Sequence, residues 1–143
     1  MKLETVDSIH LVITVGLVVL IWIIQLVHYP SFAYYQENDF AKAMNFHQSR
    51  ITLIVLPLMM IEIAALSYLS WKVTDLFYLS MLAMVILIWV STFFIQVPLH
   101  QKLLAGKDVT LITKLVSTNW IRTCLWTLKL GTLIMVATQS HSK

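Results

Sequence analysis

The chain has 143 residues, of which 59% are hydrophobic and 12% are charged, and its formal net charge is +3. Soluble domains carry about 25% charged residues, so this composition leaves too little polar surface to face water and predicts a membrane protein. Three glycines are too few for a glycine-rich phosphate-binding loop, and the single cysteine, Cys124, excludes an internal disulfide and a thiolate zinc site. The positive charges are scattered along the chain, which argues against a nucleic-acid partner.

Four apolar stretches are each long enough to cross a bilayer as a helix, which takes about 20 residues. They cover about residues 9–28, 51–70, 76–100 and 116–138. The predicted fold class is therefore all-α: a single four-span transmembrane domain, built as an integral membrane antiparallel four-helix bundle.

Two shorter helices are predicted to lead into the second and fourth spans without a break. They lie at about 39–50, with Asn38 or Asp39 as the N-cap, and at about 109–117, with Asp108 as the N-cap.

Three prolines affect the predicted spans. Pro30 disfavours helix at the residue before it, and Pro57 and Pro98 predict kinks in the second and third spans.

Four spans place both termini on one side of the membrane, which we call side B, and we call the opposite side A. The basic residues of side A are Lys42, Arg50, Lys102, Lys107 and Lys114, and those of side B are Lys2, Lys72 and Lys143. Since cytoplasmic loops carry an excess of Lys and Arg, side A is predicted to be cytoplasmic and the termini non-cytoplasmic.

Three histidines are predicted to gather near side A. His28 ends the first span, His47 lies in the helix leading into the second, and His100 ends the third. Three imidazoles from three helices at one membrane level are typical of a metal site, and copper, iron, zinc or haem are the candidates. The alternative, which the absence of a two-ligand spacing on any one helix favours, is an interfacial role in which the histidines hydrogen-bond lipid headgroups or backbone carbonyls.

Polar residues form stripes along three of the spans. The stripes are Gln25 and His28; Thr92, Gln96 and His100; and Asn119, Arg122, Trp126 and Lys129. Because the rest of each helix is apolar, the stripes are predicted to face a shared interior. In the functional interpretation, Arg122 and Asn119 bind an oxyanion or a carbonyl oxygen, Gln96 supports them, and Trp126 and Lys129 contact the cofactor.

Glu62 lies near the centre of the second span, where a lipid-facing carboxylate would cost about 3 kcal/mol. Counting about 1.5 Å of rise per residue puts Glu62 and Lys129 at similar depths. We predict that Glu62 pairs with Lys129 or Arg122, or is protonated in a polar pocket. Two roles remain open here: a structural ion pair that fixes helix register, and a catalytic carboxylate that handles a proton or contacts a ligand.

Two short motifs carry a resemblance to a known family. Gln96-Val97-Pro98-Leu99-His100, followed by Leu103, and then Asn119-Trp120-Ile121-Arg122-Thr123 are similar to motifs of the anthrone-oxygenase-like family of small four-span membrane proteins. That family has a V-P-L-N type motif at the end of span three and an N-x-x-R type motif at the start of span four, so His100 stands where Asn is usual. The fungal members of that family are linked to oxidation of polycyclic anthrones to anthraquinones, so the resemblance implies an oxygenase with no settled cofactor.

Two functions are compatible with these observations. The first is a membrane redox protein, an oxygenase or other oxidoreductase, that takes a lipophilic aromatic or quinone-like substrate near side A. His28, His47 and His100 would then hold a metal or act as acid/base groups, and Glu62 would accept a proton or be the counter-ion of Arg122 and Lys129. The alternative is a non-enzymatic accessory subunit of a larger membrane complex with a filled interior. Membrane lipid is a partner in both cases, and either could form a homo-oligomer.

Overall fold

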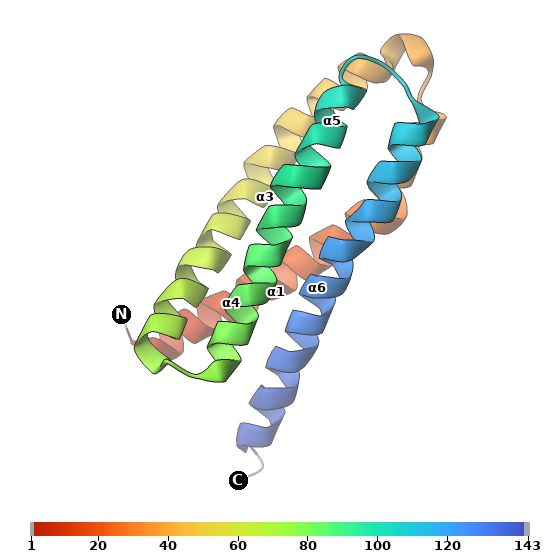
Figure 1. Ribbon diagram of the computed structural model, residues 1–143. Helices are drawn as coiled ribbons and strands as arrows, with labels where there is room; N and C mark the ends of the chain where they lie inside the picture. Colours follow the sequence, from red (N-terminus) through yellow and green to blue (C-terminus); the bar gives the residue numbers. More distant parts are fainter. Residues whose placement is uncertain (1, 142–143) are drawn as a thin grey trace.

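A computed structural model describes residues 2–141, and side chains as far as residue 139 (Figure 1). In chain order the elements are α1 (Leu3–Ile23), η1 (Ile24–His28), α2 (Tyr29–Ser31), η2 (Phe32–Tyr34), α3 (Glu37–Val73), α4 (Leu76–Ser91), η3 (Thr92–Gln96), α5 (Val97–Leu103) and α6 (Val109–His141). Of the three η segments, η1 and η3 are π-helices and η2 is a 3-10 helix.

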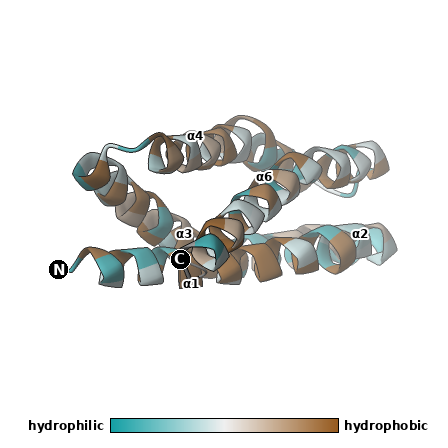
Figure 2. Ribbon diagram, turned by 90° about the horizontal axis from the view of Figure 1, so that it is seen from below, coloured by the Kyte–Doolittle hydropathy of each residue, from teal (hydrophilic) through white to brown (hydrophobic). Residues whose placement is uncertain are grey.

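These elements join into four long rods, so the protein is an all-α antiparallel four-helix bundle, as predicted. The rods Leu3–Tyr34, Glu37–Val73, Leu76–Leu103 and Val109–Gln139 are each long and apolar enough to cross a membrane. The first rod begins and the last one ends at the same end of the bundle (Figure 1). In the view from below, hydrophobic residues cover most of each helix (Figure 2), as expected for a multi-pass membrane protein.

The four rods form a closed ring in cross-section. α1 packs against α3 and α6, and α4 packs against the same two helices from the other side. The largest apolar cluster lies in the half of the bundle nearer side A and includes Leu17, Met59, Ile88 and Trp126. A second cluster around Leu66, Met81 and Val85 fills the half nearer side B.

Both π-helices are followed by a proline after one further residue. Pro30 follows η1 and Pro98 follows η3, and neither proline has an N–H to donate to the carbonyl four residues earlier. Those carbonyls, of residues 26 and 94, lie inside η1 and η3. The wider π-turn accommodates the proline ring, so the helix continues. The expectation that helix is disfavoured before Pro30 was therefore wrong, since Tyr29 is helical, with φ −66° and ψ −42°. α3 likewise runs through Pro57 as one α-helix.

The helices that lead into the second and fourth spans are present as predicted, each continuous with its span. Asp108 caps α6, since its Oδ1 accepts from the backbone N–H of Leu111 at 3.0 Å. The predicted cap of α3 was wrong, because Asn38 and Asp39 both lie inside the helix and the N-cap is Gln36. Only Tyr35 and Gln36 lie between η2 and α3, so the helix begins before Asn38.

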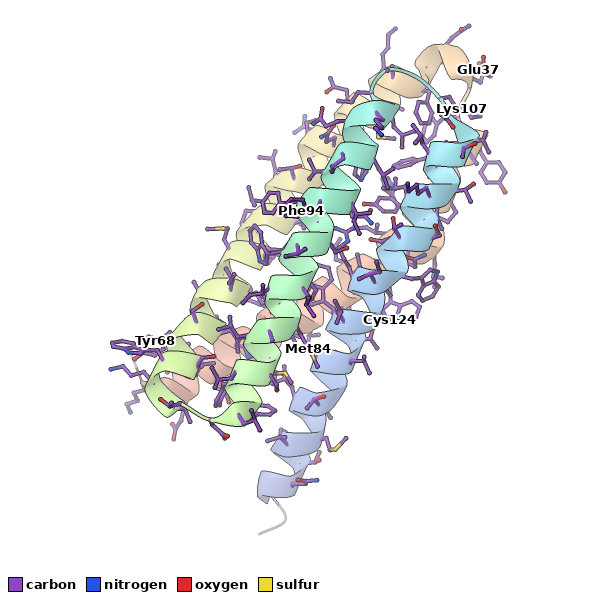
Figure 3. The ribbon with its side chains drawn as sticks, viewed as in Figure 1. Glu37, Tyr68, Met84, Phe94, Lys107 and Cys124 are labelled. Atoms are coloured by element: carbon purple, nitrogen blue, oxygen red, sulfur yellow. The ribbon has the colours of Figure 1, made fainter. Side chains whose placement is uncertain are left out.

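Lys107 hydrogen-bonds the segment that connects the first two rods. Lys107, which precedes α6, donates from Nζ to the carbonyls of Ala33 at 2.7 Å and Tyr35 at 2.8 Å. These two carbonyls lie where the first rod ends and would otherwise lack partners. Figure 3 shows Lys107 near Glu37 at the side A end of the molecule.

Candidate functional site

Glu62 and Lys129 form a fully buried ion pair at mid-depth in the bundle. Lys129 Nζ donates to Glu62 Oε1 at 2.7 Å, and neither side chain is exposed. Lys129 also donates to Thr14 Oγ1 at 2.7 Å, and Trp126 Nε1 lies 3.2 and 3.1 Å from the two carboxylate oxygens. The predicted pairing of Glu62 with Lys129 is confirmed, and the pair joins α1, α3 and α6.

A second buried polar chain lies nearer side A and surrounds Arg122. Asn119 accepts from Arg122 at its Oδ1, with 3.0 Å to Nε, and donates from Nδ2 to Gln25 Oε1 at 2.8 Å. On its other side, Arg122 donates from Nη2 to the hydroxyl of Tyr29 at 3.2 Å, and that hydroxyl is 3.0 Å from His100 Nε2. α6, η1, α2 and α5 thus each contribute a side chain to one network.

The charge of Arg122 is not balanced within this network. Arg122 is 5% exposed, and its hydrogen-bond acceptors are the neutral side chains of Asn119 and Tyr29. Among the residues that the structure describes, the one salt bridge is between Lys129 and Glu62. A buried cation without a counter-ion is costly, and an anionic or strongly dipolar oxygen of a ligand would offset that cost.

A cavity of about 240 Å³ lies directly beside Arg122. Its polar end is formed by Tyr29, Gln96, His100 and Arg122, and its remaining walls are mainly aliphatic and aromatic side chains of α1, α3, α4 and η3. The indole of Trp126 also lines the cavity, while its N–H donates to Glu62. Trp126 therefore separates the cavity from the ion pair.

The mouth of the cavity opens sideways, toward the lipid. Three of its lining residues are exposed on the apolar outer surface: Leu56 (45%) on α3, Phe93 (53%) on η3 and Val97 (37%) on α5. These residues lie in segments that are apolar enough to span a membrane, so this side of the cavity adjoins the apolar outer surface of the bundle.

The three side A histidines come together, but their nitrogens do not converge on one point. His28 Nε2 lies 2.5 Å from His47 Nδ1, and the ring centres of His47 and His100 are 5.6 Å apart. His100 Nε2 is directed at Tyr29 instead. Among the described residues no group of three His, Cys, Asp or Glu side chains is arranged to hold a metal ion. The ring nitrogens are turned toward one another and toward Tyr29, and the metal site at His28, His47 and His100 stays a prediction.

The other predicted site residues divide between the cavity and its surroundings. Gln96 lines the cavity and donates to Thr118 Oγ1 at 3.0 Å, which leaves its buried Oε1 without a partner. Asn119 orients Arg122 from behind. Glu62 and Lys129 lie behind Trp126 and do not line the cavity. The proposed contact of Lys129 with a cofactor therefore has no support in the geometry.

Tyr29 is a site residue that the sequence analysis missed. It is 4% exposed and links Arg122 to His100. The signal was present, since Tyr29 follows Gln25 by four residues and so continues a polar helix face. Its position next to Pro30 suggested the end of a helix and concealed that pattern.

Comparison with models of protein families, with curated proteins and with solved structures gave no match for this chain.

Proposed function

We propose that the protein is a membrane oxidoreductase that binds a lipophilic aromatic or quinone-like substrate in the cavity, with an oxygen atom of the substrate held by Arg122. The observation that carries this proposal is the unbalanced, buried charge of Arg122 at the polar end of a largely apolar cavity that opens toward lipid. The resemblance of the Gln96–His100 and Asn119–Thr123 motifs to the anthrone-oxygenase-like family supports the same substrate class, because those motifs supply the polar end.

The dimensions and lining of the cavity favour a flat ring system. An engineered apolar cavity of about 150 Å³ holds benzene, and the volume here is about 240 Å³. Trp89, Phe93 and Trp126 provide aromatic surface along the walls. A compound with fused rings and one oxygen substituent would bury its rings against these side chains and direct the oxygen at Arg122.

The polar end is suited to removing a proton from such a substrate. Tyr29 and His100 are hydrogen-bonded to each other beside Arg122, so a proton from a phenol, or from the anthrone CH₂ that is conjugated with the ring carbonyl through the fused aromatic rings, can pass to His100 Nε2. The charge left on the substrate oxygen is then stabilised by the guanidinium. Dioxygen is the oxidant. The CH₂ group of the anthrone and one O₂ give the second carbonyl of the anthraquinone and one water.

Acid–base chemistry by Tyr29, His100 and Arg122 is better supported than a metal held by the three histidines. The ring nitrogens of His28 and His47 bind each other, and no three-ligand arrangement exists among the described residues. The alternative of a non-enzymatic accessory subunit predicts a filled interior, so the cavity beside Arg122 supports the enzymatic proposal.

The proposal is tested with the whole protein in lipid nanodiscs and 1,8-dihydroxyanthrone as the probe. Saturable quenching of tryptophan fluorescence reports binding, because Trp89 and Trp126 line the cavity, and the appearance of the anthraquinone absorption reports turnover. Arg122→Gln is expected to weaken binding about 10-fold or more, since hydrogen bonds to charged groups contribute about 1.5–3 kcal/mol.

Arg50→Gln is the matched control, because Arg50 is the other arginine of the chain and does not line the cavity. It should bind and turn over the probe like the wild-type protein. Equal affinity of Arg122→Gln and wild type, or an absence of saturable binding to the wild type, would contradict the proposal.

A further inference from the structure

A second groove runs between α1 and α3 in the half of the bundle nearer side A, with a volume of about 810 Å³. It adjoins the cavity, since Leu20, Ile24 and Ile51 line both. Its two ends differ in character. One end is formed by the aliphatic residues Leu20, Ile23, Ile51 and Ile54, and the other carries Asp39, Lys42 and Arg50, with Tyr35 beside them. His47 lies within the charged stretch of α3, between Lys42 and Arg50, and its partner His28 lines the groove from η1.

The charged end is built on one face of α3. Lys42, Phe46 and Arg50 are spaced four residues apart, so they follow one another along the groove, and all three are exposed. The Arg50 guanidinium lies 5.5 Å from the centre of the Phe46 ring. Within the described part of the chain neither Lys42 nor Arg50 forms an ion pair, so both cations are available to a ligand.

Along α3 the charged end of the groove lies further out than the aliphatic end, as the headgroup of a bilayer lipid lies further out than its acyl chains. The apolar part of the second span begins at Ile51, directly after Arg50. At about 1.5 Å of rise per residue, Lys42 lies about 12 Å further out than Arg50. The stretch of α3 from Lys42 to Arg50 therefore lies at the depth of the lipid headgroups. Ile54 on α3 and Ile23 on α1 lie at the depth of the hydrocarbon layer.

We propose that this groove binds one anionic phospholipid. The phosphodiester lies between Lys42 and Arg50, and an acyl chain runs along Ile23 and Ile54. The charges match a single negative phosphate, because two cations and the carboxylate of Asp39 leave a net charge of +1 at this end. Asp39 accepts a hydrogen bond from a headgroup hydroxyl, such as one of a glycerol headgroup.

Two other occupants fit less well. A free phosphate would leave the aliphatic end of the groove unused. A second copy of the chain would have to bury Lys42 and Arg50 against a surface that is mainly apolar within the span. The lipid satisfies both ends at once, and the proposal does not depend on the function proposed for the cavity.

The experiment uses the full chain, delipidated in a neutral detergent, with native mass spectrometry as the readout. The protein is mixed with phosphatidylglycerol, phosphatidylethanolamine and phosphatidylcholine of identical acyl chains. We expect wild type to retain one phosphatidylglycerol at least 10-fold more strongly than either zwitterionic lipid, and we expect Lys42→Gln/Arg50→Gln to lose this preference.

Lys102→Gln/Lys114→Gln is the matched control, because both lysines are exposed on side A, lie outside the groove and give the same change in charge. It should keep the preference. Ile54→Trp fills the apolar end without changing the charge and should also reduce retention. Circular dichroism confirms that each variant is folded.

Equal retention of the three lipids by wild type would overturn the proposal. So would an equal loss of the phosphatidylglycerol preference in the groove variant and in the control variant. A dimer that Ile54→Trp dissociates would also overturn it, since the occupant of the groove would then be a second copy of the chain.

Discussion

Glu62 and Lys129 lie where neither has access to water, so each charge depends on the other for its stability. Removing one member of such a pair leaves an unpaired buried charge and costs about 3–5 kcal/mol, whereas replacing both members is often neutral. Since the pair lies behind Trp126 and outside the cavity, its contacts with α1, α3 and α6 favour the structural role over the catalytic one.

We predict that Glu62→Gln lowers the free energy of unfolding by about 3 kcal/mol, because Lys129 is left as an uncompensated cation. In Glu62→Gln/Lys129→Met both charges are gone and the Gln oxygen still accepts from Trp126, so most of the stability should return. Thermal unfolding in detergent micelles measures both. If the single variant is as stable as wild type, or the double variant is no better than the single one, the ion pair does not hold these helices together.

The sequence allowed the Glu62–Lys129 pair to be predicted because helical rise converts residue number into depth. It could not give the partners of the histidines, because topology brings residues to one level without fixing where their ring nitrogens point. His28 and His47 are turned toward each other, and His100 is turned toward Tyr29. Tyr29 itself was missed because Pro30 was taken as the end of the helix.

At the scale of elements, η1 and η3 decide which side chains face the interior. A π-turn contains one residue more than an α-turn, so the helix after the turn is rotated about its axis relative to the helix before it. Gln25 lies in η1 and Tyr29 directly follows it, while Gln96 is the last residue of η3 and His100 lies one turn beyond it. The two π-turns therefore set the direction in which Tyr29 and His100 face. The sequence predicted a disturbance at Pro98, but hydropathy and residue spacing do not distinguish a kink from a π-turn.

We predict that Pro98→Ala weakens binding of 1,8-dihydroxyanthrone at least threefold with unchanged helix content. Alanine restores an N–H that can bond the carbonyl of residue 94, so η3 can relax to an α-helix, and Gln96 and His100 rotate relative to Arg122. Fluorescence titration and circular dichroism measure the two quantities. Pro57→Ala is the control, since α3 has no π-turn at that proline. Equal weakening by both substitutions, or by neither, would count against this role of η3.

At the scale of the whole molecule, the sequence predicted the bundle well, because length and apolarity alone determine which segments cross a bilayer. It left open whether the interior holds a cavity or is filled, because that depends on how side chains from four rods meet. It does predict an orientation, since more Lys and Arg lie at side A than at side B. We propose on this basis that side A is cytoplasmic.

Cysteine labelling tests this orientation in a Cys124→Ser background, which removes the one native cysteine. Lys72→Cys lies at side B and Lys102→Cys at side A, and both lysines are exposed. A membrane-impermeant maleimide should label the first variant in intact cells and the second only after permeabilisation. The reverse pattern would place the termini in the cytoplasm.

The sideways mouth of the cavity changes how its affinity has to be expressed. A ligand that arrives between Leu56 and Phe93 is drawn from a two-dimensional solvent, so the relevant quantity is its mole fraction in the bilayer, and its aqueous concentration matters only through partitioning. Compounds that differ greatly in solubility could then saturate the cavity at the same membrane loading. A ligand could also carry a long alkyl tail at little cost, because the tail would remain in the surrounding lipid while the ring alone occupied the cavity.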